Sequence, residues 1–228
     1  WPGMALDEKR GLVFVPTGSA SPDYFGGLRV GNDGHANSIV ALHARTGEVA
    51  WHFQTIHHDL WDYDVASPAL LYPGENGPAV AVGTKVGHLF LFDRRTGRPL
   101  FPVEERDVPA STIPGEAAWP TQPFPSESLR LLPTRVRPDD AWGLTFWDRG
   151  KCRDALAGLH NDGIFTPLAE QPTLLFPGSL GGANWGGGAY SPQTQRLIVN
   201  VNAAPFVAHL IRGAGSTTQQ DHPVAGQK

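Results

Sequence analysis

An internal repeat restricts the fold of this chain more than any other sequence feature. Two Thr-Gly pairs, Thr46-Gly47 and Thr96-Gly97, lie 50 residues apart, and each is flanked by short apolar runs. Glycine supplies the positive φ that a tight turn between two strands needs. Repeats of about 40 to 50 residues that contain several short strands are typical of β-propellers. The sequence therefore predicts an all-β fold, specifically a partial β-propeller.

The predicted strands are short runs rich in apolar and β-branched residues. They fall at 12–16, 38–42, 49–53, 79–83, 88–92, 173–176, 196–201 and 205–208. The best helix candidate, 153–159, is short. Trp51 follows Gly47 by four residues, and in a propeller its ring would pack between adjacent blades.

We expect one partial propeller domain over residues 1–228. Within it, 1–101 would form two repeat-like blades, and 102–140, which hold eight of the 21 prolines, a Pro-rich loop insertion. Residues 141–212 would supply further blade segments, and 213–228 a flexible tail.

Composition excludes several classes of protein. Seven Trp and eleven Phe favour an ordered core. A net charge of -4 without a basic stripe argues against a nucleic-acid partner, and the single Cys152 excludes an internal disulfide. No run approaches the roughly 18 apolar residues of a membrane span, and no signal peptide opens the chain. Because Trp1 leads directly into patterned sequence, we expect an internal segment of a longer polypeptide.

The most chemically loaded stretch is 57–64, which reads HHDLWDYD and follows a predicted strand. Such a polar segment at a sheet rim is where sites usually lie. Asp62 could be a general base or simply a turn carboxylate. Composition alone favours the turn carboxylate, whereas the whole cluster together with Lys85 at a later strand start favours catalysis. His57 or His58 could orient that carboxylate. Adjacent residues on a strand point to opposite faces, so the two imidazoles are not expected to share a metal ion.

A glycine-rich stretch, 181–188, separates two of the later strands. Small residues there would let backbone approach a ligand or a ring closely. It is not a phosphate loop, because no helix follows to offer its N-terminus.

Four motifs in chain order, at 57–64, 93–97, 163–167 and 184–187, resemble the membrane-bound quinoprotein glucose dehydrogenases and the related polyol and quinate dehydrogenases. These enzymes use pyrroloquinoline quinone (PQQ). The resemblance runs from residue 1 to about residue 212. It implies a middle segment of an eight-bladed propeller whose central funnel holds the cofactor and a metal ion.

The resemblance also implies roles for individual residues. Asp62 matches the proton-accepting aspartate, and Lys85 matches the lysine that bonds the quinone oxygens. Asn200 matches an asparagine that contacts PQQ, Trp1 stands where a tryptophan stacks under the PQQ ring, and Trp185 lies in a motif near the cofactor. From the residues alone, Lys85 could equally be a solvated loop lysine, and Asn200 could be satisfied by backbone.

Two departures concern the metal, which the resemblance implies is calcium or magnesium. Ser19 stands where many relatives carry a metal-binding asparagine, and the upstream pair of acidic ligands is missing from this chain. The metal ligands therefore remain unassigned.

The function implied is a PQQ-dependent dehydrogenase that oxidises a sugar or polyol hydroxyl. Asp62, oriented by His58, would accept the hydroxyl proton while hydride passes to the quinone, and Lys85 would polarise the quinone carbonyl. Electrons would pass to a membrane quinone at the periplasmic side of the bacterial inner membrane, which the enzyme would reach only through segments absent from this chain. The rival interpretations are a non-catalytic propeller scaffold for protein binding and an inactive fragment.

Overall fold

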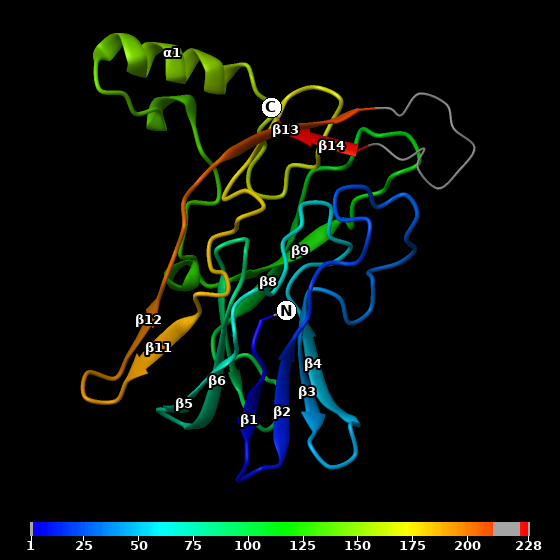
Figure 1. The fold of residues 1–228 in the computed structure, drawn as a ribbon, viewed down its shortest axis with the longest axis vertical. Coiled ribbons are helices and arrows are strands. Elements are labelled where there is room, and N and C mark those ends of the chain that lie inside the picture. Colours follow the sequence, from blue (N-terminus) through cyan, green and yellow to red (C-terminus); the bar gives the residue numbers. More distant parts are fainter. Residues whose placement is uncertain (1, 212–223, 228) are drawn as a thin grey trace.

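Short antiparallel strands dominate the part of the chain that the structure, a computed structural model, describes: residues 2–211 and 224–227 (Figure 1). The first sheet has the strand order β1-β2-β3-β4 and consists of β1 Ala5–Asp7, β2 Leu12–Pro16, β3 Ser38–His43 and β4 Val49–Gln54. The second has the order β5-β6-β7 and consists of β5 Leu70–Gly74, β6 Gly77–Gly83 and β7 Leu89–Asp93. The predicted all-β class is confirmed.

The two Thr-Gly turns have the same geometry. Gly47 follows β3 with φ 74°, and its N–H donates to the carbonyl of His43 at 2.8 Å. Gly97 follows β7 with φ 70°, and its N–H donates to the carbonyl of Asp93 at 2.9 Å. The repeat seen in the sequence is thus a repeat of backbone conformation.

Trp51 on β4 joins the two sheets. Its ring centroid lies 5.7 Å from that of Phe14 in the first sheet and 5.9 Å from that of Phe92 in the second. The indole N–H donates to the carbonyl of Arg94 at 3.1 Å, and a Cβ at Gly97 would lie 2.5 Å from the ring. The prediction that Trp51 packs between adjacent blades is confirmed, and it also belongs to the buried core.

The Pro-rich segment contains a strand pair that the sequence prediction missed. β8 Val103–Asp107 pairs with β9 Thr121–Pro125 in an antiparallel ladder, so the segment is not entirely loop-like. Pro123 and Pro125 lie within β9. β9 pairs with β8 alone, and a proline is tolerated on an edge strand because its missing N–H is not required there.

A helix of twelve residues, α1 Phe146–Ala157, starts seven residues before the helix candidate and ends two residues short of its end. Thr145 caps it, with its hydroxyl accepting from the N–H of Asp148 at 3.2 Å. None of the residues of α1, all of which the structure describes, is buried. The helix therefore has no apolar face, and the sequence shows no helical periodicity of apolar residues that would predict it. Figure 1 shows it standing apart from the sheets. Two single 3₁₀ turns, η1 Glu127–Leu129 and η2 Pro138–Asp140, precede it.

The later strands form two smaller sheets. β11 Gly188–Ser191 pairs with β12 Arg196–Val199, and the other sheet has the order β10-β13-β14, with β10 Thr173–Leu175, β13 Phe206–Ile211 and β14 Val224–Gln227. Strand β14 lies within the predicted tail and pairs with β13 in an antiparallel ladder. The remainder of that predicted tail lies outside the described residues. Within the described part, no helix is long and apolar enough to cross a membrane.

A second core lies under the 57–64 segment. Trp61 and Tyr63 are fully buried, and both contact the ring of Phe165. The Trp61 indole N–H donates to the carbonyl of Thr166 at 2.8 Å, and the Tyr63 hydroxyl donates to that of Ile164 at 3.1 Å. This core fixes the segment that carries Asp62.

Candidate active site

A buried lysine lies between two carboxylates. The Lys85 Nζ atom is 3.0 Å from Asp62 Oδ2 and 2.7 Å from Asp64 Oδ2. The Lys85 side chain is 5% exposed and that of Asp64 is 9% exposed, whereas that of Asp62 is 20% exposed. The structure therefore brings Asp62 and Lys85 together, and Lys85 is not a solvated loop lysine.

The connection between β6 and β7 positions Lys85. Its backbone N–H donates to the carbonyl of Asp64 at 3.2 Å, which ties this turn to the 57–64 segment. The N–H of Gly182 donates to the carbonyl of Lys85 at 2.5 Å, and a Cβ at Gly181 would collide with the Lys85 side chain. The glycine-rich stretch thus approaches Lys85 closely, whereas we expected it to approach a ligand or a ring.

Burial and neighbouring charges determine the protonation states of Asp62 and Lys85. Burial raises the pKa of Asp62 to about 7, with Lys85 opposing the rise and Asp64 adding to it. Burial alone would lower the pKa of Lys85, but its hydrogen bond to Asp64 and the charge of Asp62 outweigh burial and raise it. Lys85 thus stays an ammonium, while Asp62 changes charge near neutral pH. A carboxyl with a pKa near the working pH is suited to general base catalysis.

Asp64 was missed as a site residue by the sequence analysis. Its Oδ1 atom accepts the N–H of Ser19 at 2.5 Å, while Oδ2 faces Lys85. The sequence feature that could have indicated Asp64 is its spacing of two residues from Asp62. This spacing does not predict a contact with Lys85 unless the path of the backbone is known.

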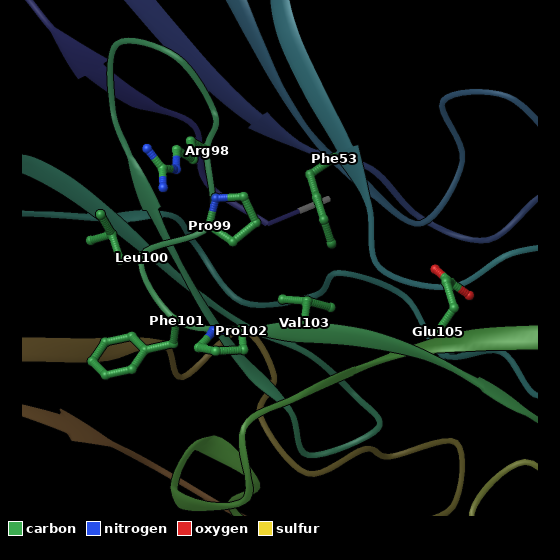
Figure 2. Close-up of a pocket in the computed structure, with 8 residues that line it drawn as sticks. All are labelled: Phe53, Arg98, Pro99, Leu100, Phe101, Pro102, Val103 and Glu105. Carbon is green, nitrogen blue, oxygen red and sulfur yellow. The ribbon is translucent and has the colours of Figure 1, made fainter.

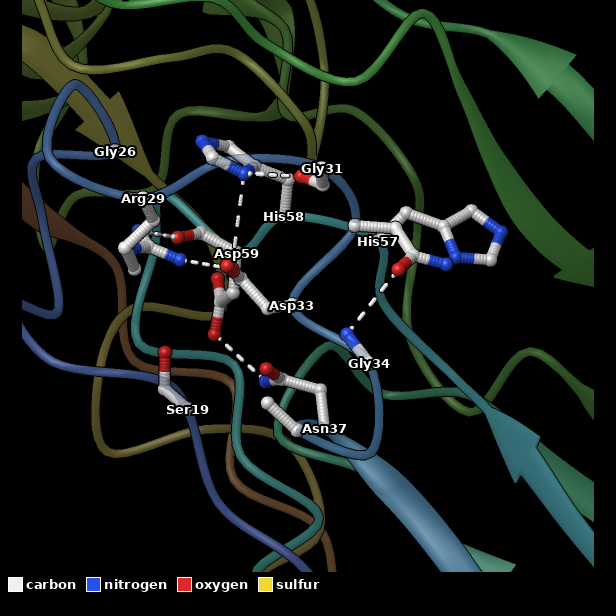
Figure 3. Close-up of polar contacts among 12 residues, drawn as sticks. Ser19, Gly26, Arg29, Gly31, Asp33, Gly34, Asn37, His57, His58 and Asp59 are labelled. Carbon is white, nitrogen blue, oxygen red and sulfur yellow. Dashed lines mark hydrogen bonds and ion pairs between the residues drawn. The ribbon is translucent and has the colours of Figure 1, made fainter.

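The two histidines do not orient Asp62. His58 has φ 45°, and its Nδ1 atom is 2.7 Å from the carbonyl of Gly31 and 3.7 Å from Asp33 Oδ2 (Figure 3). His57 Nδ1 is 2.7 Å from Gln54 Oε1. The hydrogen bond from His58 to Asp62 that we expected is not formed among the described residues. The reason is the left-handed backbone at 58, which places the imidazole against the loop around residue 31.

Asn200 lies against the glycine-rich stretch that contains Trp185. A Cβ at Gly186 would lie 3.3 Å from Asn200 Nδ2, and the N–H of Asn200 faces the carbonyl of Gly187 at 3.4 Å. Trp185 is 73% exposed, so its ring is open to a ligand. The same stretch contacts Lys85 through Gly181 and Gly182. Trp1, the other predicted cofactor contact, lies outside the described residues.

No metal centre forms from the described residues. They contain no group of three or more His, Cys, Asp or Glu side chains arranged to hold a metal ion. The two carboxylates nearest the site, those of Asp62 and Asp64, both face Lys85.

Two cavities lie away from this group. One, of about 460 Å³, lies beside β8 and is lined by Phe53, Arg98, Pro99, Leu100, Phe101, Pro102, Val103 and Glu105 (Figure 2). The other, of about 990 Å³, lies between the Pro-rich segment and α1. Neither is lined by any predicted site residue in the described part of the chain.

Comparison with known proteins places the fold. The model of the glucose/ethanol/alcohol dehydrogenase β-propeller domain, a PQQ family, matches residues 1–228. The crystal structure of quinohemoprotein alcohol dehydrogenase from Comamonas testosteroni is similar with a TM-score of 0.58 and 22% identity, covering 92% of this chain and 26% of that one. The predicted partial propeller is confirmed.

Curated relatives are closer in sequence. The quinoprotein glucose dehydrogenase of Escherichia coli (strain K12) is 42% identical over 99% of this chain. The quinate/shikimate dehydrogenase (quinone) of Acinetobacter baylyi is 39% identical over 88% of it. The chain spans 29% of the first relative and 26% of the second.

Proposed function

The chain belongs to the family of PQQ β-propeller domains of glucose, ethanol and alcohol dehydrogenases, and we propose that it contributes the base of such an active site. The substrate would be a sugar or polyol hydroxyl, and the sugar part of this proposal is in keeping with the name of the glucose dehydrogenase relative. The observation that carries the proposal is the 3.0 Å pair of Asp62 Oδ2 and Lys85 Nζ. An acid–base group and a cation are thereby held together.

Oxidising an alcohol requires removal of the hydroxyl proton as a hydride leaves the carbon. When bound, PQQ supplies the quinone carbonyl that accepts the hydride. Asp62 would accept the proton at a carboxylate oxygen, which its 20% exposure leaves reachable from solvent. Lys85 would hold a positive charge beside the quinone oxygens and stabilise negative charge as it develops there.

Lys85 and the glycine-rich stretch offer groups that a planar cofactor could contact. The ammonium group is held by its carboxylate neighbours, and the glycine-rich stretch has no room for a side chain at Gly181. Trp185 offers an exposed ring, and Asn200 an exposed amide. Both would contact the cofactor. No step is assigned to a calcium or magnesium ion, because no three His, Cys, Asp or Glu side chains of the described residues are grouped so as to hold one.

The proposal extends to the electron acceptor and the location. Electrons would pass to a membrane quinone, in agreement with the word quinone in the name of the quinate/shikimate relative. The working site would be the periplasmic face of the bacterial inner membrane. Any membrane attachment would come from segments of the longer enzyme.

Replacing the proposed base tests this function. In the full-length enzyme that we propose contains this chain, Asp62→Asn should abolish dye reduction with glucose, polyols and quinate while PQQ still binds. Asp93→Asn, at the end of β7 where it pairs with Arg95 at 2.6 Å, is the control and should retain turnover. Full activity in Asp62→Asn would remove this residue from the mechanism. Absence of PQQ binding to the unaltered protein would favour a scaffold.

A further inference from the structure

Two backbone amides on either side of Asp62 point to one carboxylate. The N–H of Trp61 donates to Asp59 Oδ1 at 2.8 Å, and the N–H of Tyr63 donates to Asp59 Oδ2 at 2.7 Å. Asp62 is the residue between those two amides. Its backbone is therefore constrained from both sides by the same side chain.

The constraint matters because Asp62 has an uncommon conformation. Its φ is 60°, in the left-handed region that residues other than glycine rarely occupy. Such a backbone persists only where the surroundings over-determine it. The two hydrogen bonds to Asp59 supply this determination, and the resulting direction of the Asp62 side chain is the one that meets Lys85.

Asp59 is itself held rigidly. It is 0% exposed, and the Asn37 Nδ2 group donates to its Oδ2 atom at 2.8 Å and to the carbonyl of Tyr63 at 3.1 Å (Figure 3). Arg29 Nη2 donates to the backbone carbonyl of Asp59 at 2.5 Å. The carboxylate is thus shielded from solvent, and its oxygens are directed at the turn that carries Asp62.

We propose that Asp59 is a positioning residue for the reaction, with its carboxylate fixing the left-handed turn at Asp62 and thereby the alignment of the base. This inference rests on the proposed function of Asp62. It goes beyond that function because Asp59 is fully buried and acts on the backbone that carries Asp62. A displacement of about 1 Å in an active site can lower the rate about 10²-fold.

Asp59→Asn is the informative variant, because it preserves size but replaces one of the two acceptor oxygens by an NH2 group, so that one of the two backbone N–H groups loses its acceptor. We expect faster hydrogen exchange at the amides of Trp61 and Tyr63 in the full-length protein. In the PQQ-loaded enzyme, kcat should fall at least about tenfold, and the pH midpoint of kcat should shift. The stoichiometry of PQQ binding should not change.

Asp7→Asn is the matched control. Asp7 is also buried, at 5% exposure, and it pairs with Arg10 at 3.1 Å and Arg94 at 3.0 Å in the first sheet. Losing a buried carboxylate there should lower Tm without changing kcat or exchange at residues 61 and 63. If Asp59→Asn lowered only Tm, as Asp7→Asn does, Asp59 would be structural and the proposal wrong.

A second variant covers the case in which Asp59→Asn does not fold. Asn37→Ser removes one donor to Asp59 but leaves the carboxylate, so kcat should fall by a smaller factor in a folded enzyme. Unchanged kcat and exchange in Asn37→Ser would then overturn the proposal. The outcome for Asp62→Asn stays separate: an inactive Asp62→Asn together with a fully active, folded Asp59→Asn refutes only the positioning role.

Discussion

Asp64 Oδ2 lies 2.7 Å from Lys85 Nζ, and both side chains are at most 9% exposed. Asp62 is farther from the same nitrogen and more exposed, and its pKa is raised to about 7. The two carboxylates thus have different roles. Asp64 remains the counter-ion of the ammonium, while Asp62 is free to gain and lose a proton.

The first prediction concerns that counter-ion. Asp64→Asn should destabilise the fold, near the lower end of the about 3–5 kcal/mol expected when one partner of a buried ion pair is removed, because Asp62 still faces Lys85. Chemical unfolding measures this loss, with Asp93→Asn as the partly exposed control. A loss no larger than that of the control would show that Asp64 is not the main counter-ion.

The second prediction concerns the pH dependence of turnover. Asp62 must be ionised to accept a proton, and its pKa is about 7, so kcat should rise with pH to an inflection near that value. The negative charge of Asp64 helps to raise the pKa of Asp62, so Asp64→Asn should move the inflection to lower pH. Steady-state kinetics across pH 5 to about 9 in both enzymes test this. An inflection that stays in place would exclude Asp62 as the titrating group.

The third prediction is that the contribution of Asp62 to stability falls with rising pH, whereas kcat rises. The pKa of Asp62 rises from its ordinary 3.8 to about 7 on folding, so the folded state binds more protons than the unfolded state between these values. The contribution of Asp62 to the free energy of unfolding is therefore largest below pH 3.8 and falls as pH rises toward about 7. Unfolding curves of the wild type and Asp62→Asn should diverge over this window. Parallel pH profiles would contradict the raised pKa.

Local sequence rules predicted the repeated part of the fold well. The turns at Gly47 and Gly97 require positive φ, and the Thr-Gly pairs predicted these turns. Trp51 packs between the two sheets, as its position four residues after Gly47 predicted. The strand pair β8–β9 and the helix α1 escaped detection for a local reason as well. Prolines occupy the edge strand β9, and α1 has no buried face to give its sequence a period.

The candidate site was predictable only in part. Asp62 and Lys85 were paired through a family resemblance, and the structure places them 3.0 Å apart. The contacts of Asp59, Asp64 and His58 depend on left-handed backbone at residues 58 and 62. Only a few per cent of non-glycine residues adopt this conformation, so the residue types alone do not locate it. A pattern of residue types cannot indicate which carboxylate in HHDLWDYD faces a lysine and which receives backbone amides.

The last prediction tests the glycine-rich stretch against Lys85. Gly181→Ala should weaken PQQ binding and lower stability, because a Cβ there meets the Lys85 side chain and φ is 76°. Gly47→Ala is a matched control, since its φ is 74° but nothing lies within 4 Å of the added Cβ. The control should lose about 1 kcal/mol from backbone strain alone, and Gly181→Ala about 1–3 kcal/mol more from overpacking. Equal losses of stability and unchanged cofactor titration would mean that the Lys85 side chain moves aside without cost. The glycine-rich stretch would then not position the ammonium group.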